Sequence, residues 1–485
     1  GAARPAARRG AGAGVALAPA GAAMSAALAY LGLADAARQI RRRELSPVEL
    51  THALIGRIER LDPALNAFLR FTPEAALGEA KAAEAEIAAG RWRGPMHGVP
   101  YALKDIIDYA GLPTTAHSKV LAGNIAKADA FVAARLRAAG GVHLGKLSTH
   151  EFAIGGPSFD LPWPPARNPW SREHFPGGSG AGLAAGFFPA ALGTDTGGSV
   201  RNPASMCGIA GMKPTYGRVS RRGVVPLAQS LDHVGPMTRG VRDNAMLLAV
   251  IAGHDPQDPA SADEPVDDYL AAIDQGVRGL RIGALRHFYT EDCAADPEQG
   301  AAIEDALAIW RDAGAVIEEV RLPPLETWNA PTRVIIAAEA FTVHERWLRE
   351  RPGDYGARGR ERLLQGALLR AADYIQAQRQ RLHLIRLMAE AMRGLDALVT
   401  VSSHDPAPRI DDDAALAHAY ERQARMPFNL TGYPALVIPA GFTRAQHLPL
   451  SVQIVGHPFE EAAVYRIAQA YEAATRWVDR HPPLE

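Results

Sequence analysis

Helical and strand-like segments alternate along the whole chain, and this alternation limits the folds open to it. Residues 130–140 have a helical pattern, and the apolar run at 141–147 is typical of a buried strand. Further strand-like runs occur late, at 396–403, 434–441 and 450–456. Strands spread from end to end and separated by helices predict one large α/β domain with a central sheet.

The first 23 residues differ in composition from the rest of the chain. Arg8 and Arg9 precede a stretch of small residues in which Val15 and Leu17 are the only strong hydrophobes. A secretion signal has a more apolar core. Because Met24 follows directly, we expect residues 1–23 to be a disordered extension ahead of an internal start, and residues 24–485 to form the folded domain.

Two stretches have clear helical signals. Ser46 precedes a proline and has a glutamate three residues later, which indicates a helix N-terminus. Leu50, Leu54 and Ile58 then repeat at helical spacing. The segment from about 265 to 395 is predominantly helical in pattern.

Charge and cysteine content exclude several classes of protein. The net charge is −1, so no basic surface for nucleic acid or an anionic membrane is indicated. No run of about 18 apolar residues is present, so we expect no membrane-spanning helix. The two cysteines allow no disulfide framework and fit a reducing compartment. We therefore expect a soluble, cytoplasmic protein.

Cofactor motifs are matched only superficially. Gly140, Gly145 and Lys146 have phosphate-loop spacing, but Leu147 stands where a Mg²⁺-binding Ser or Thr is needed. The GAGLAA run at 180–185 resembles a dinucleotide fingerprint without the preceding strand. No H-E-x-x-H motif occurs, and the 16 histidines show no ligand spacing. We expect neither a cofactor nor a metal.

The stretch GTDTGGSVRNPA at 193–204 presents a serine directly after two glycines. Gly197 and Gly198 can adopt positive φ and let the backbone approach a ligand closely. Free N–H groups beside Ser199 are suited to an oxyanion hole, although a surface turn uses glycines in the same way. Since Arg201 stands where a nucleophile elbow has glycine, that serine-hydrolase arrangement is excluded.

A lysine in an apolar segment is the second unusual feature. Lys104 lies within GVPYALKDIID at 98–108, which has the pattern of a buried strand. Desolvation lowers the pKa of a lysine and allows its amine to act as a base. There are two alternatives to a base: Lys104 pairs with Asp105, or its amine extends to the surface.

Three segments together resemble the amidase signature family: GVPYALKDIIDYAG, the block from FPGGSGAG to RRGVVP, and FNLTGYPALVIPAGF. The resemblance covers about 24–480 and is tightest at about 95–240. It implies an amidase signature fold, a mixed sheet surrounded by helices, and a Ser–cis-Ser–Lys triad. The residues that match are Lys104, Ser179 and Ser199 for the triad and Thr196, Gly197, Gly198 and Ser199 for the oxyanion hole.

One loop departs from the family pattern. The interval between Ser179 and Ser199 is about four residues shorter than in the family. Either this loop is shorter, or four residues are absent from the numbering. We favour the second explanation, because the loss of four residues beside a catalytic serine is hard to accommodate.

The implied chemistry is an acyl-enzyme mechanism. Neutral Lys104 accepts a proton from Ser179, which accepts the proton of Ser199, and Ser199 attacks the carbonyl carbon. Asp195 and Arg201 flank the nucleophile, either as a buried pair that fixes the turn or as solvated charges.

Two functions remain open at this point. The first, which we favour, is a free-standing hydrolase of amides or carbamates. The second is the glutaminase component of a tRNA-dependent amidotransferase complex, which depends on protein partners. The helical region at 265–395 is expected to shape the acyl pocket, with Ile335, Ile336, Phe341 and Trp347 as candidates that serve equally well as core. The oligomeric state is left open, a homodimer included.

Overall fold

A single sheet organises the part of the chain that the structure describes. The computed structural model describes residues 27–484, so the predicted extension lies outside the described residues. The sheet has eleven strands in the order β1-β3-β2-β4-β6-β5-β10-β11-β9-β7-β8. The strands are β1 (Phe68–Phe71), β2 (Pro100–Lys104), β3 (Val142–Leu147), β4 (Ala190–Asp195), β5 (Ala210–Lys213), β6 (His233–Thr238), β7 (Arg281–Ala284), β8 (Val316–Glu319), β9 (Ala397–Thr400), β10 (Ala435–Phe442) and β11 (Pro449–Val455).

The sheet is mixed. Strand β2 runs parallel to both of its neighbours, β3 and β4, and β7 runs parallel to β8 and β9. The remaining neighbours pair antiparallel, including the long β10–β11 pair. This arrangement confirms the predicted α/β fold with a mixed central sheet.

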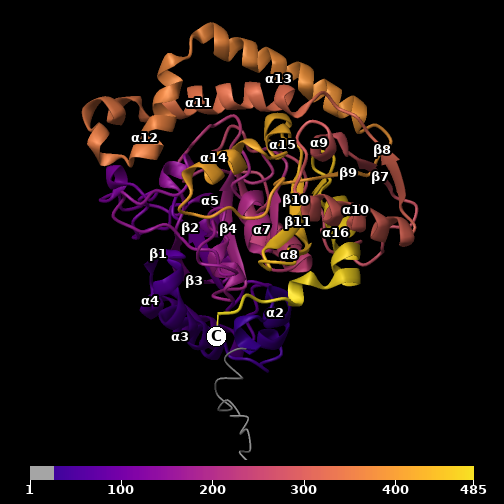
Figure 1. Ribbon diagram of the computed structural model, residues 1–485. Helices are drawn as coiled ribbons and strands as arrows, with labels where there is room; N and C mark the ends of the chain where they lie inside the picture. The colour runs from indigo at the N-terminus through magenta and orange to yellow at the C-terminus, as the bar shows by residue number, and fades with distance from the viewer. Residues whose placement is uncertain (1–26, 485) are drawn as a thin grey trace, which may run out of the picture.

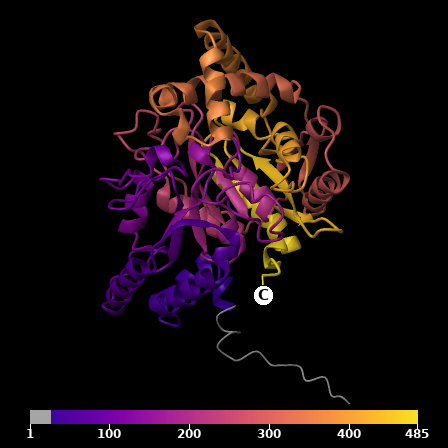
Figure 2. The same cartoon turned by 60° about the vertical axis from the view of Figure 1, so that its left-hand side comes forward.

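Helices surround the sheet (Figures 1 and 2). They are α2 (Leu33–Arg41), α3 (Pro47–Leu65), α4 (Pro73–Ala88), α5 (Phe131–Ala138), α6 (Ala181–Ala184), α7 (Arg201–Cys207), α8 (Val241–Ile251), α9 (His287–Thr290), α10 (Pro297–Asp312), α11 (Leu325–Glu350), α12 (Ala357–Leu364), α13 (Ala371–Ala391), α14 (Asp413–Glu421), α15 (Met426–Thr431) and α16 (Glu461–Thr475). In Figure 1 the long helices α11 and α13, in orange, lie together across the top of the molecule.

Alternation along the central strands divides the core into two layers. Leu436 and Ile438 of β10 belong to one cluster of buried side chains, together with residues of α8, α10 and α16. Val437, between them, belongs to a second cluster with residues of α3, α4 and α7. Because successive side chains of a strand point to opposite faces, helices bury both faces of the sheet.

Local signals in the sequence correspond to real helix boundaries. Helix α3 begins at Pro47, and the Ser46 hydroxyl accepts hydrogen bonds from the backbone N–H groups of Val48 and Glu49. Leu50 and Leu54 are buried on its inner face. The capping signal therefore placed the helix correctly.

The segment predicted to be predominantly helical also contains two strands. Strands β7 and β8 lie within residues 265–395 and extend the sheet at one edge. Each has only four residues, and β8 is partly exposed, so neither has a long apolar run. The two strands pair with each other across more than 30 residues of sequence, and β7 also pairs with β9, which a local pattern does not reveal.

None of the helices between residues 27 and 484 combines the length and the apolarity needed to cross a membrane.

Candidate functional site

Lys104 and Ser199 meet at one edge of the sheet because of strand direction. Lys104 is the last residue of β2, and β4 ends at Asp195, four residues before Ser199. Strands β2 and β4 are parallel neighbours, so their carboxyl ends share an edge. The loop at 196–200 then connects β4 to α7. Ligand sites of α/β proteins commonly form where parallel strands end.

The Lys104 amine is buried and has no carboxylate within hydrogen-bond distance in the described part of the chain. Lys104 is 3 % exposed, and its Nζ donates to Thr194 Oγ1 at 2.8 Å. Burial lowers the pKa of Lys104 to about 8, although Asp195 and Asp232 oppose this shift. A pKa near 8 leaves roughly a tenth of the amine uncharged at pH 7. The buried-strand prediction for Lys104 is confirmed.

The neighbouring carboxylate pairs with a different lysine. Lys146 Nζ lies 2.9 Å from Asp105 Oδ1, and both side chains are buried. Asp105 also accepts hydrogen bonds from the backbone and hydroxyl of Thr115. The alternative in which Asp105 pairs with Lys104 is therefore wrong.

A buried ion pair fixes the loop that carries Ser199. Arg201 donates to both carboxylate oxygens of Asp195, at 2.9 and 3.0 Å, and neither side chain is exposed. The backbone N–H groups of Val200 and Arg201 also point to Asp195, at 3.3 Å. Burial raises the pKa of Asp195, but Arg201 and Asn429 outweigh burial and hold it below its ordinary value. The pair fixes the turn, as one of our two alternatives predicts.

Four backbone N–H groups in this loop remain available to a ligand. Within the described residues, the N–H groups of Thr196, Gly197, Gly198 and Ser199, the four expected from the sequence, donate to no acceptor. Gly198 has φ of +130°, and a Cβ there would lie 2.3 Å from Arg425 Nε. Only glycine fits such a position. Thr196 Oγ1 donates to Asp232 Oδ1 at 2.5 Å, which anchors the other end of the loop.

Ser179 lies on a turn packed against the start of α7. A Cβ on Gly177 would meet Pro203 at 2.8 Å, and Asn202 Nδ2 donates to the Gly177 carbonyl. The Ser179 hydroxyl donates to the carbonyl of Ser148 at 2.7 Å. Ser148 directly follows Leu147, the residue paired with Lys104 across β2 and β3.

Neither direct contact of the expected relay is among the hydrogen bonds of residues 27–484. Lys104 donates to Thr194, and Ser179 donates to Ser148. No peptide bond in these residues is cis, so the expected cis bond at Ser179 is not found. A trans bond is favoured by roughly 2.5–4 kcal/mol for residues other than proline. The positive φ angles of Gly177 and Gly178, +79° and +141°, turn the chain instead.

The loop after Ser179 is truly short, which corrects our preferred explanation. The chain is continuous from Ser179 to Ser199 in sequence and in structure. Helix α6 has only four residues. A Cβ on Gly180 would lie 2.9 Å from Pro203, and one on Gly182 would lie 2.5 Å from Phe188. Glycines without room for a side chain let the shortened loop pack closely on its neighbours.

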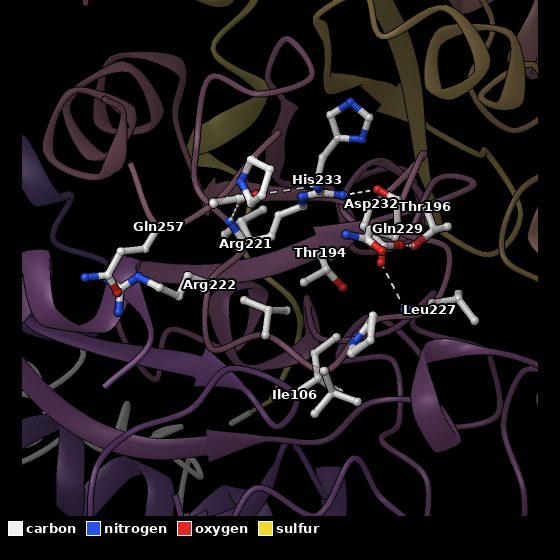
Figure 3. Close-up of a pocket in the computed structure, with 16 residues that line it drawn as sticks. Ile106, Thr194, Thr196, Arg221, Arg222, Leu227, Gln229, Asp232, His233 and Gln257 are labelled. Carbon is white, nitrogen blue, oxygen red and sulfur yellow. Dashed lines mark hydrogen bonds and ion pairs between the residues drawn. The ribbon is translucent and has the colours of Figure 1, made fainter. Parts of the chain in front are cut away.

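The loop at 196–200 borders two cavities. Thr194 and Thr196 line a cavity of about 290 Å³, shown with Asp232 and Arg221 in Figure 3. Gly197, Gly198 and Ser199 line a second cavity of about 60 Å³. The nucleophile candidate therefore faces the smaller cavity, and the threonine bound to Lys104 faces the larger one.

The apolar candidates on α11 take different positions. Ile335 is fully buried in the core, whereas Phe341 and Trp347 pack against it from partly buried positions. Ile336 approaches the site, since a Cβ on Gly197 would lie 3.5 Å from its Cδ1. Helix α11 also lines a cavity of about 620 Å³ through Ala338, Glu339, Thr342 and Val343.

Several site residues were missed by sequence reasoning. Thr194, Ser148 and Arg425 contact the three candidates or their loop, yet none stands in a motif with chemical meaning. For Thr194, the one signal in the sequence was its closeness to Ser199, since both lie in the stretch at 193–204. Arg425 lies far along the chain and reaches the site only through the fold. In the described part of the chain, no group of three His, Cys, Asp or Glu side chains is arranged to hold a metal ion.

Comparisons with known proteins identify the family. The family model named Amidase matches residues 49–465. The chain is 40 % identical over 489 residues to a protein of Chloroflexus aggregans named as the A subunit of glutamyl-tRNA(Gln) amidotransferase, covering 94 % of this chain and 99 % of the relative. Among solved structures, peptide amidase from Stenotrophomonas maltophilia matches with a TM-score of 0.81 and 33 % identity, over 93 % of this chain and 98 % of that one. A chain of a vestigial complex, described as revealing the origins of an s-triazine catabolic enzyme, matches with a TM-score of 0.86 and 32 % identity, covering 92 % and 99 %.

Proposed function

Because the chain belongs to the amidase family, we propose that it hydrolyses the carbon–nitrogen bond of an amide through an acyl-enzyme on Ser199. The observation that carries this proposal is the loop at 196–199, which holds four unbonded N–H groups beside a serine hydroxyl. A buried lysine with a lowered pKa lies at the same sheet edge. These are the donors and the base that acyl transfer requires.

The chemical steps follow from these groups. Uncharged Lys104 accepts a proton from Ser179 as Ser179 accepts the proton of Ser199, and the Ser199 oxygen forms a bond to the carbonyl carbon. N–H groups of the loop formed by Thr196, Gly197, Gly198 and Ser199 stabilise the negative oxygen. The carbon–nitrogen bond then breaks, and the nitrogen leaves with a proton returned from Lys104. Water hydrolyses the ester and releases the acid.

This relay requires two side chains to exchange partners. Lys104 Nζ has to leave Thr194, and the Ser179 hydroxyl has to leave the Ser148 carbonyl. Both are single hydrogen bonds made by rotatable groups, and catalytic contacts often tighten only when substrate is bound. We propose that substrate binding aligns Ser179 between Lys104 and Ser199.

Two finer functions share this chemistry, and the curated relatives favour the second. Sequence reasoning alone placed a free-standing amidase, acting on amides or carbamates, first. The relative from Chloroflexus aggregans, aligned over almost the full length of both chains, is named as part of an amidotransferase. This name supports a glutaminase subunit that works with protein partners in tRNA-dependent amidation, in the cytoplasm.

The surface of the helical region is consistent with a partner chain. Leu368 and Leu382 are 83 % and 70 % exposed, and Ile375 is exposed between them. Ile375 and Leu382 lie seven residues apart on α13 and therefore on the same side of the helix. Exposed apolar groups on one side of a long helix are suited to contact with another protein.

Hydrolysis by the purified chain separates these possibilities. Release of ammonia or amine is measured with simple amides, carbamates and L-glutamine, for the native chain and for Ser199→Ala. Turnover of simple amides without turnover of glutamine supports the free-standing amidase. Selective turnover of glutamine supports the glutaminase subunit. Hydrolysis that persists in Ser199→Ala contradicts the proposed mechanism.

A further inference from the structure

The small cavity beside Ser199 contains a buried cation. Arg425 is 3 % exposed and lines this cavity of about 60 Å³ together with Ser199, His150 and Tyr420. Its Nε is directed to the Gly198 backbone, since a Cβ on Gly198 would lie 2.3 Å from that nitrogen. Ser199 is the next residue in the chain and lines the same cavity, so Arg425 and the nucleophile candidate border one space.

Hydrogen bonds hold Arg425 in place without neutralising its charge. Nη1 donates to the Ser402 carbonyl at 3.1 Å and to Ser403 Oγ at 2.5 Å. Nε has no hydrogen-bond partner within residues 27–484. Those residues provide no salt bridge to Arg425, whereas the nearby Asp195 carboxylate is held by Arg201 and Asn429.

The other polar groups at this cavity do not compensate the charge. Burial, and then Lys104, lower the pKa of His150 to about 3, so the imidazole is neutral. Burial raises the pKa of Tyr420, so its hydroxyl stays protonated. Burial, and then Arg201, lower the pKa of Arg425 to about 9, while Asp195 and Tyr420 raise it. Arg425 is thus still a cation at neutral pH.

An unpaired buried charge is costly unless a ligand supplies its counterion. Arginine nitrogens suit a carboxylate, which accepts strong charge-assisted hydrogen bonds. The cavity is small, and Arg425 lies next to the residue that precedes the nucleophile, so a carboxylate bound there has to lie close to the scissile carbonyl. Resting on the proposed function, we propose that Arg425 is a specificity-determining residue that binds a carboxylate on the acyl portion of the substrate.

This assignment defines the substrate class. The best substrates are short amides of dicarboxylic acids in which one carboxyl group is free. Malonamate and succinamate have this form, and malonamide and succinamide are neutral counterparts of nearly the same shape. The difference in kcat/KM between each acid and its diamide therefore measures the recognition of the carboxylate charge, which we assign to Arg425.

Kinetics on these pairs test the assignment. In the native chain, kcat/KM for each acid should exceed that for its diamide. Arg425→Met should lower kcat/KM for the acids roughly 10- to 150-fold, mainly by raising KM, and leave the diamides nearly unchanged. Arg425→Lys should retain part of the preference. The matched control is Arg422→Met on the same segment, because Arg422 is paired with Asp405 and should leave the preference intact.

Outcomes against the proposal are equally distinct. An equal loss of kcat for acids and diamides in Arg425→Met, with an unchanged circular dichroism spectrum, would place Arg425 in oxyanion stabilisation and overturn it. If Arg425→Met does not fold, the ratio of kcat/KM for the acids to kcat/KM for the diamides is compared between the native chain and Arg425→Lys. An acid preference below about twofold in the native chain, or one that Arg425→Lys leaves unchanged, then overturns the proposal.

Binding separates this inference from the proposed reaction. Calorimetry with succinamate uses Ser199→Ala and the double variant Ser199→Ala/Arg425→Met. Binding that is lost only in the double variant supports the Arg425 site even if the native chain proves to hydrolyse by another route. Equal succinamate affinity of the two variants, or no binding by Ser199→Ala, overturns the Arg425 site whatever the nucleophile is.

Discussion

Charged residues are arranged very differently at the sheet edge that carries the candidate site and on the outer helices. At the edge, Asp195 and Arg201 are fully buried and share two hydrogen bonds. On α11, Arg349 pairs with Glu345 four residues away, and both side chains are at least half exposed. Figure 1 shows α11 and α13 on the outside of the molecule, away from β1 and α3.

This contrast separates the buried edge, to which we assign the reaction and the selectivity, from the outer helices, to which we assign contacts with a partner. A buried pair that loses one member leaves an uncompensated charge, so its geometry is strongly enforced. An exposed pair on a helix contributes little. We therefore expect the proposed acyl transfer to depend on the buried edge and to tolerate changes in exposed ion pairs of the outer helices.

The largest effect at the buried edge is expected from Lys104. Lys104→Ala removes the base and the later acid of the relay and should lower kcat by about 10²- to 10⁴-fold. Lys104→Arg should fail similarly, because arginine stays protonated. The measurement is kcat with circular dichroism as the folding control. Near-normal activity of the arginine variant would show that Lys104 is a structural cation.

The pH dependence sharpens the same point. The proposed reaction needs uncharged Lys104, and burial lowers the pKa of this amine to about 8. Activity should therefore rise with pH, nearly tenfold per unit below pH 7.5, and level off above about pH 8.5, as a property of the coupled relay. The profile of kcat from pH 6 to 10 checks this. A plateau that already begins at pH 6 would contradict an amine base.

The next effect concerns stability. Asp195→Asn leaves the buried Arg201 without its counterion and should lower the free energy of unfolding by about 3–5 kcal/mol. Because the folded pKa of Asp195 lies below its ordinary value, its contribution is present above about pH 4 and is lost as the pH falls further. Urea unfolding at pH 7 and pH 3 measures both. A loss below 1 kcal/mol at pH 7 would mean that the pair does not fix the loop.

The smallest effect is expected on α11. Glu345→Gln breaks the exposed pair with Arg349 and should change the free energy of unfolding by less than about 0.5 kcal/mol, with unchanged kcat. This substitution is the matched partner of Asp195→Asn, since each removes one carboxylate charge from an arginine pair. Comparable losses for the two variants would break the contrast between the regions.

The sequence predicted the parts of this site that depend on neighbours along the chain. The apolar residues around Lys104 predicted its buried strand, and the glycines before Ser199 predicted a loop with close backbone approach. The Asp195–Arg201 pair was one of two alternatives, because the two residues flank Ser199 and the sequence did not show whether they are buried or solvated. The amidase resemblance supplied the role of Ser179, which stays a prediction.

The parts that were missed depend on contacts between distant segments. Thr194 binds Lys104 because β2 and β4 are adjacent, and Arg425 reaches Gly198 because α15 packs beside the loop. Strands β7 and β8 are too short to stand out and are stabilised by pairing with each other and with β9. The short loop after Ser179 is accommodated because Gly180 packs against Pro203 and Gly182 against Phe188, and composition alone does not show these contacts.

Covalent labelling of Ser199 tests the central claim most directly. The native chain is treated with a fluorophosphonate, and the modified peptide is identified by mass spectrometry, with Ser199→Ala as the matched control. The account predicts one adduct, on Ser199, that is absent from the variant and that forms faster as the pH rises through about 8. An adduct on Ser179 or Cys207 in place of Ser199 would contradict it.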